Sequence, residues 1–152
     1  MTATKETFMT YVIDAPTLSL AGADALCAHA EAEAERAGVR LCIAVVDAAG
    51  HLLTFCRMDG AGLVSIEVAM GKARTAALLK APSRLFEEKI DSGAPSILSA
   101  PGLVPLRGGV PVMRGKQQVG AIGVSGAAGE VDEAVALAAV VAFGREQEQW
   151  HG

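Results

Sequence analysis

The chain has 152 residues, of which 51% are hydrophobic, 20% charged and only 4% aromatic, and its formal net charge is -4. This length suits one domain with a substantial core, and the acidic balance lacks the positive surface with which proteins bind nucleic acid. No run approaches the ~18 apolar residues that span a membrane, so we expect no membrane partner. Three cysteines without CxxC spacing predict free thiols, a cytoplasmic location and no structural zinc site.

We expect residues 1–16 to form an N-terminal lead-in and residues 17–152 to form a single domain. Thr17 or Ser19 can cap a helix that runs to about Ala37, because apolar residues recur there at helical spacing and a glycine follows. So many apolar residues on a short chain predict more apolar surface than a monomer can bury. We therefore expect the chain to self-associate.

Residues 41–47 and 51–57 have the pattern of two strands joined by a three-residue loop that ends in glycine, a common hairpin closure. Both faces of this hairpin are largely apolar, so we expect the sheet to be covered on both sides. The loop predicts these facing pairs: Cys42 with Cys56, Ile43 with Phe55, Val45 with Leu53, and Asp47 with His51.

Residues 63–80 have the apolar spacing of a second helix, with Lys72 directed toward solvent or a pocket. A shorter helix is expected over residues 83–90. The segment 91–107 is rich in glycine and proline and is expected to be irregular. Long loops of this kind often form the walls of a site or contacts between subunits.

A second hairpin is predicted from two apolar segments, 110–114 and 117–124, on either side of the loop Gly115-Lys116. The short loop predicts that Val112 faces Val119. A last helix is expected over residues 129–149. The order helix, hairpin, helices, loop, hairpin and helix predicts an α+β fold, in which helices flank a mainly antiparallel sheet.

Several blocks of residues follow one another in an order and at spacings that are specific when they are taken together. They are Ala44-Val45-Val46-Asp47-Ala48-Ala49-Gly50-His51-Leu52 with Arg57-Met58-Asp59-Gly60-Ala61, then Ala69-Met70-Gly71-Lys72-Ala73-Arg74-Thr75-Ala76, then Gly108-Gly109-Val110-Pro111-Val112, and finally Gly120-Ala121-Ile122-Gly123-Val124-Ser125-Gly126 followed by Asp132. Over about residues 17–143 the chain resembles the GlcG/HbpS-like family, which includes the C-terminal domain of PduO. It departs from the family's pattern at Ala127-Ala128, where a further glycine is common.

The resemblance implies a profilin-like domain that assembles into dimers and often octamers. Members of the family have been linked to haem binding, to haem breakdown and to cobalamin-related gene clusters. The first hypothesis is therefore a cytoplasmic homodimer or octamer that binds haem or a related tetrapyrrole in an apolar pocket between subunits.

Haem requires an axial donor, usually a neutral histidine, beside an apolar slot. The candidate ligands are His29 on the first helix and His51 at the tip of the first hairpin. If they bind no metal, His29 would be a surface histidine beside glutamates, and His51 would form an ion pair with Asp47. Further residues are candidates to bind the propionates of haem, another carboxylate or a small anion. The cations are Arg57, Lys72, Arg74 and Arg107, the glycines that allow close backbone approach are Gly108 and Gly109, and the hydroxyl is that of Ser125.

A second hypothesis uses the same pocket for proton transfer on a small organic acid, as in an isomerase or tautomerase. Asp59 or Glu67 would be the base and Arg57 the anion anchor, although Asp59 at a turn can equally be a cap. A third hypothesis is an accessory assembly protein without a ligand, in which the faces rich in alanine and glycine make only subunit contacts.

Overall fold

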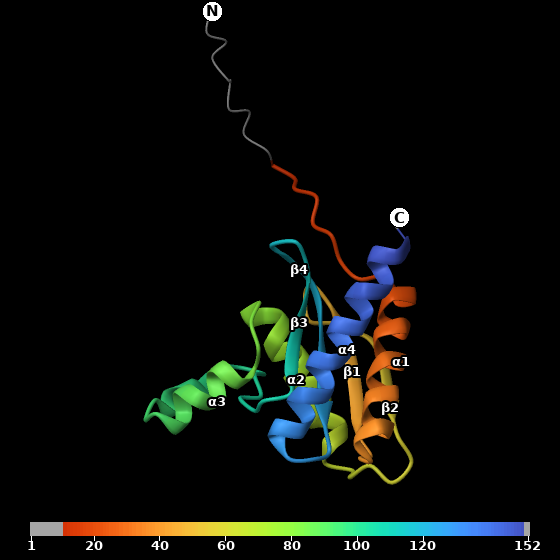
Figure 1. Ribbon diagram of the computed structural model, residues 1–152. Helices are drawn as coiled ribbons and strands as arrows, with labels where there is room; N and C mark the ends of the chain where they lie inside the picture. Colours follow the sequence, from red (N-terminus) through yellow and green to blue (C-terminus); the bar gives the residue numbers. More distant parts are fainter. Residues whose placement is uncertain (1–10, 151–152) are drawn as a thin grey trace, which may run out of the picture.

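The computed structural model describes residues 11–150, which form a four-stranded sheet with helices on both faces (Figure 1). The strands lie in the order β2-β1-β4-β3, and each neighbouring pair is antiparallel. The predicted α+β fold is confirmed. The elements in chain order are α1 (Leu20–Ala37), β1 (Cys42–Asp47), β2 (Leu52–Arg57), α2 (Ser65–Leu79), α3 (Arg84–Asp91), the 3-10 helix η1 (Pro95–Ser99), β3 (Gly109–Arg114), β4 (Gln117–Ser125) and α4 (Gly129–Trp150).

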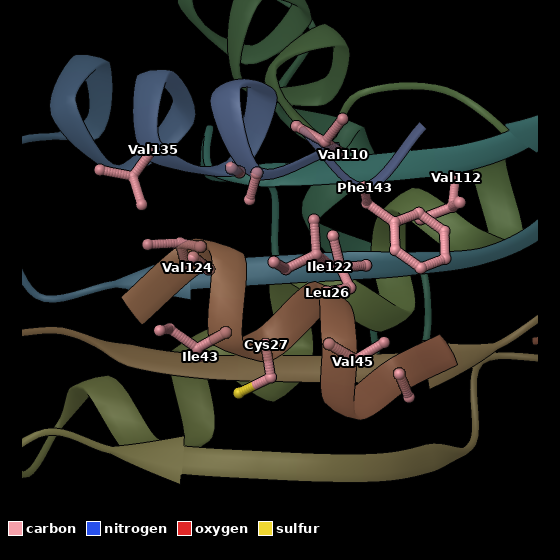
Figure 2. Packing of buried hydrophobic residues seen from close by; sticks show 14 of the residues in the cluster. Leu26, Cys27, Ile43, Val45, Val110, Val112, Ile122, Val124, Val135 and Phe143 are labelled. Carbon is pink, nitrogen blue, oxygen red and sulfur yellow. The ribbon is translucent and has the colours of Figure 1, made fainter. Parts of the chain in front are cut away.

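The two faces of the sheet are packed differently. Helices α1 and α4 lie side by side over one face (Figure 1), and the core between them and the sheet contains large side chains (Figure 2). Helix α2 covers the other face, where most of the buried residues are alanines. Small side chains let a helix approach a sheet closely, so the backbone of α2 lies near that of the sheet. The large residues include Leu26, Ile43, Ile122 and Phe143, and the alanines include Ala44, Ala69, Ala73, Ala76 and Ala121.

The first helix begins and ends as its sequence predicts. The Ser19 side chain accepts a hydrogen bond from the backbone N–H of Gly22, and Gly38 ends the helix with a φ of 69°. Such a left-handed terminus suits glycine because it has no Cβ. Of the predicted lead-in, residues 1–10 lie outside the described part of the chain. Just before the helix, the backbone N–H of Leu18 donates to the carbonyl oxygen of Val119 over 2.8 Å, which fastens this segment to β4.

The predicted register of the first hairpin holds next to the loop, where Val46 pairs with Leu52 and the backbone N–H of Asp47 donates to the carbonyl oxygen of His51. It is wrong by one residue from Val45 back to Cys42. An irregularity between Val45 and Val46 shifts the pairing, so that Cys56 faces Ile43 and Cys42 faces Arg57. A bulge adds one residue to a strand and turns the following side chains to the other face. Cys42 therefore packs on the α2 side of the sheet, whereas Cys56 packs against the core on the α1 side.

The second hairpin has the predicted loop and again a shifted register. Arg114 pairs with Gln117 on either side of Gly115-Lys116, but a bulge follows at Val112/Met113. Val112 consequently faces Gly120, and the predicted pair of Val112 with Val119 is wrong.

The helix predicted over 83–90 is present as α3 and, with η1, projects from the sheet (Figure 1). No residue of these two helices is buried. In the described part of the chain, no helix is both long enough and apolar enough to cross a bilayer.

Cys27 and Cys56, the two cysteines on the α1 side of the sheet, make the stability of the fold depend on pH in the alkaline range. Burial is the main reason that the pKa of Cys27 rises to about 12 and that of Cys56 to about 11, from an ordinary value of 9.0. Between about pH 9 and 12 the folded chain thus retains thiol protons that the unfolded chain releases, so we expect stability to fall as the pH rises through this window. Urea unfolding at pH 8 and pH 10.5 measures the fall.

Tyrosine and lysine titrate in the same range, so the wild type is best compared with Cys27→Ala and Cys56→Ala. Each variant should lose less stability between pH 8 and pH 10.5 than the wild type does. Equal losses in all three proteins would contradict the assignment to these thiols.

Candidate functional site

Close contact between α2 and the β3–β4 hairpin positions the side chains of the candidate site. A Cβ on Gly123 would lie 2.1 Å from the carbonyl oxygen of Ala69, and one on Gly109 would lie 2.2 Å from that of Lys72. Real Cβ atoms do not approach so closely, so glycine is required at both positions for α2 to lie where it does. The helix consequently directs Lys72 along the sheet toward the end of β4.

Lys72 forms a buried ion pair with Asp132, which lies in the first turn of α4. The ammonium Nζ is 2.9 Å from the Asp132 carboxylate and 2.9 Å from the carbonyl oxygen of Val124, and the two residues are only 3% and 2% exposed. Gly108 leaves room for this ammonium, because a Cβ there would lie 2.9 Å from Nζ. The pair joins α2 to α4 across the end of the sheet.

The carboxylate of Asp132 also binds the backbone just before α4, close in sequence to Ser125, one of the residues predicted to bind an anion. Its second oxygen accepts a hydrogen bond of 2.9 Å from the backbone N–H of Ala127. Burial raises the pKa of Asp132 above its ordinary value, while the hydrogen bond from Lys72 acts in the opposite direction. One amide at the start of α4 is therefore already satisfied within the chain.

The first pocket, which we call the Lys72 pocket, has a volume of about 400 Å³ beside this ion pair. Its lining unites three of the predicted ligand-binding residues, Lys72, Arg107 and Ser125. Arg107 is already paired, with its Nε 2.5 Å from the Glu87 carboxylate of α3. The lining thus has two positive and two negative side chains, and an anionic ligand would have to compete with Glu87 and Asp132.

The second pocket, which we call the Met70 pocket, lies on the other side of α2 and has a volume of about 420 Å³. Its apolar walls come from β1, β2, α2 and the segment before β3. Glu67 and Arg74 provide charge, and no ion pair of Arg74 is found among residues 11–149. The apolar lining residues are Val46, Leu52, Met70, Leu103 and Val104.

The two candidate histidines lie in different places. His29 is on α1, across the sheet from α2, and its Nε2 is 2.6 Å from the Glu146 carboxylate of α4. His51 is exposed at the β1–β2 tip, and both of its chain neighbours, Gly50 and Leu52, line the Met70 pocket. Its own backbone N–H donates to the side chain of Asp47.

The remaining predicted residues do not join one constellation. Arg57 shares a row of the sheet with Cys42 and Ser125 but is outside the lining of the Lys72 pocket. Asp59 is exposed in the turn after β2, away from the lining of either pocket, whereas Glu67 lines the Met70 pocket.

Sequence reasoning did not assign a site role to Met70, Asp132 or Glu87. A signal for Met70 was present in the sequence, because Met70 lies two residues before Lys72 in the same block. Residues two apart on a helix do not face each other, so these side chains lie on different sides of the helix. The partners Asp132 and Glu87 are 60 and 20 residues from the cations they bind, a separation that no local pattern reveals.

The antiparallel sheet between one helix and a helix pair defines a small α+β domain with two pockets next to α2. The family described as haem degrading protein HbpS-like matches residues 18–141. The chain therefore belongs to the HbpS-like family.

Known proteins agree with this membership. The protein GlcG of Escherichia coli strain K12 is 40% identical over 108 residues, which are 71% of this chain and 81% of GlcG. A double mutant of HbpS from Streptomyces reticuli is 33% identical with a TM-score of 0.81, covering 93% of this chain and 97% of HbpS. The PduOC–haem complex is 29% identical with a TM-score of 0.76, covering 83% of this chain and 94% of PduOC.

Proposed function

We propose that this protein binds haem or a related tetrapyrrole in the Met70 pocket, where a second copy of the chain completes the walls. The observation that carries the proposal is the combination of an apolar lining with the exposed guanidinium of Arg74, which has no ion pair among residues 11–149. A tetrapyrrole presents a flat apolar ring and carboxylate side chains, and a guanidinium binds carboxylates through two parallel hydrogen bonds. The haem in the PduOC complex and the description of the family support the choice of ligand.

A second copy is proposed because the pocket has exposed apolar residues at its edge. Leu52 is 50% exposed although it lines the pocket, and it belongs to the edge strand β2. Covering such residues with another subunit stabilises the assembly and removes water from the ligand. We also propose a cytoplasmic location, since three free thiols suit a reducing compartment.

Of the two candidate axial ligands, His51 is the one that we propose. Its chain neighbours Gly50 and Leu52 line the Met70 pocket, whereas His29 is bound to Glu146 across the sheet. When bound, haem would supply an iron centre to which a neutral imidazole can coordinate. Arg74 would hold a propionate and Met70 would pack against the ring.

The ligand assignment is tested by absorbance spectra of haem complexes. We expect His51→Ala to shift the Soret band or to abolish it, because the imidazole donor is lost. His29→Ala is the matched control and should leave the spectrum unchanged. If His29→Ala alone changes the spectrum, or if neither variant does, the assignment of His51 is wrong.

A second candidate function is proton transfer on a small organic acid, which the lining shared by Glu67 and Arg74 favours. A carboxylate and a guanidinium in one pocket can act as base and anion anchor. In this hypothesis Arg74 takes the role that the sequence suggested for Arg57. Turnover of a carboxylic acid by haem-free protein, with loss of turnover in Glu67→Gln, would favour it over the tetrapyrrole.

A further inference from the structure

Three side chains with metal-binding atoms meet between α1 and β2, on the opposite side of the sheet from both pockets. Cys27 and Glu31 are four residues apart on α1 and so project from the same face of the helix. Cys56 reaches them from β2. The two sulfur atoms and one carboxylate oxygen all lie within 4.8 Å of one another. Figure 2 shows Cys27 at the edge of the core with its sulfur directed away from the labelled apolar side chains.

The spacing of these atoms fits a tetrahedral metal centre after small movements. Bonds of about 2.3 Å to sulfur and about 2.1 Å to oxygen place tetrahedral ligand atoms roughly 3.5–3.8 Å apart. The Cys27 sulfur is already 3.9 Å from a Glu31 oxygen. Glu31 and Cys56 are only half-buried, so solvent can reach the cluster.

We propose that Cys27, Cys56 and Glu31 bind one Zn²⁺ ion, with water as the fourth ligand. Thiolates select soft and borderline cations, and a carboxylate completes a donor set that zinc commonly accepts. Hard cations such as Mg²⁺ and Ca²⁺ prefer sites made only of oxygen. This site goes beyond the tetrapyrrole proposal and is independent of it.

Zinc at this position would connect α1 to the edge strand β2. The bound form requires two thiolates, so each zinc that enters releases thiol protons to solvent. The third cysteine, Cys42, is buried on the α2 side of the sheet and takes no part. Cys42 is therefore a matched control for loss of a buried thiol.

The test is a competition for Zn²⁺ between the reduced, metal-free full chain and a chromophoric chelator. The wild type should take up one Zn²⁺ per chain. Cys56→Ser and Glu31→Gln should each weaken zinc binding. Loss of a group that only hydrogen-bonds to a metal ligand lowers metal affinity by up to about 100-fold, so loss of the Cys56 thiolate itself should lower it by more. Cys42→Ser should bind zinc as the wild type does.

A measurement on the wild type alone guards against variants that fail to fold. Zinc should slow alkylation of the half-buried Cys56, as measured by mass spectrometry of digested protein. Three results would overturn the proposal: no zinc uptake by reduced wild type, equal weakening by Cys42→Ser, or an unchanged alkylation rate. Reduced protein that takes up no zinc but oxidises to a Cys27–Cys56 disulfide would show a redox pair in place of a metal site.

Discussion

Lys72→Met should lower the free energy of unfolding by about 3–5 kcal/mol, the usual loss when one partner of a buried ion pair is removed. Without the ammonium, the Asp132 carboxylate would stay buried with no opposite charge, and the carbonyl oxygen of Val124 would lose its donor. Urea unfolding at neutral pH measures the loss. Lys80→Met removes an exposed cation at the C-cap of the same helix and should change stability by no more than about 1 kcal/mol, the usual contribution of a cation at a helix C-terminus.

The double variant Lys72→Met/Asp132→Asn separates loss of a charge pair from loss of packing. Asparagine keeps an oxygen for the backbone N–H of Ala127 but carries no charge. Replacing both partners of a buried pair is far less costly than removing one. We therefore expect the double variant to recover most of the stability that Lys72→Met loses. A double variant as unstable as the two single losses added together would contradict an ionic coupling between these residues.

Gly123→Ala should lower the free energy of unfolding by at least about 3 kcal/mol, which is at or beyond the upper end of the usual loss when a core is overpacked. The new Cβ would lie 2.1 Å from one backbone atom of α2 and 2.4 Å from another, so no side-chain rotation relieves the clash. The helix would have to move off the sheet, which would also displace Lys72 and both pockets. Thermal and urea unfolding measure the effect on stability.

Gly144→Ala is the matched control, since it places the same methyl group on α4 where no heavy atom lies within 4 Å. It should raise stability by up to about 1 kcal/mol, because alanine is the better helix former. If both substitutions have the same small effect, the close approach of α2 to the sheet is not the constraint described.

The sequence was enough to predict the helices and hairpins, because their signals are local. Ser19 and Gly38 mark the ends of α1, and Gly115-Lys116 marks the second hairpin. The registers could not be predicted, because nothing in the residues near Val45 or Val112 distinguishes a bulge from regular pairing.

The candidate site was predicted only in part, and the reason is again distance along the chain. Lys72, Arg107 and Ser125 were each predicted as candidates to bind an anionic group, and they line one pocket. The sequence could not show that Asp132 and Glu87 already neutralise these two cations. It also could not show that Arg74 remains without such a partner among residues 11–149. Because Lys72 and Arg107 are paired and Arg74 has no ion pair in the described part of the chain, the tetrapyrrole site is proposed in the Met70 pocket rather than in the Lys72 pocket.

The most direct test of this proposed site is a haem titration followed by the Soret band, with the mass of the assembly measured by light scattering. Wild-type protein should give a saturable band at one haem per chain or per dimer. Arg74→Gln should weaken binding, and Arg145→Gln, an exposed arginine on α4, should not. A folded wild-type assembly that gives no saturable Soret band, or equal binding by all three proteins, would contradict haem binding in the Met70 pocket.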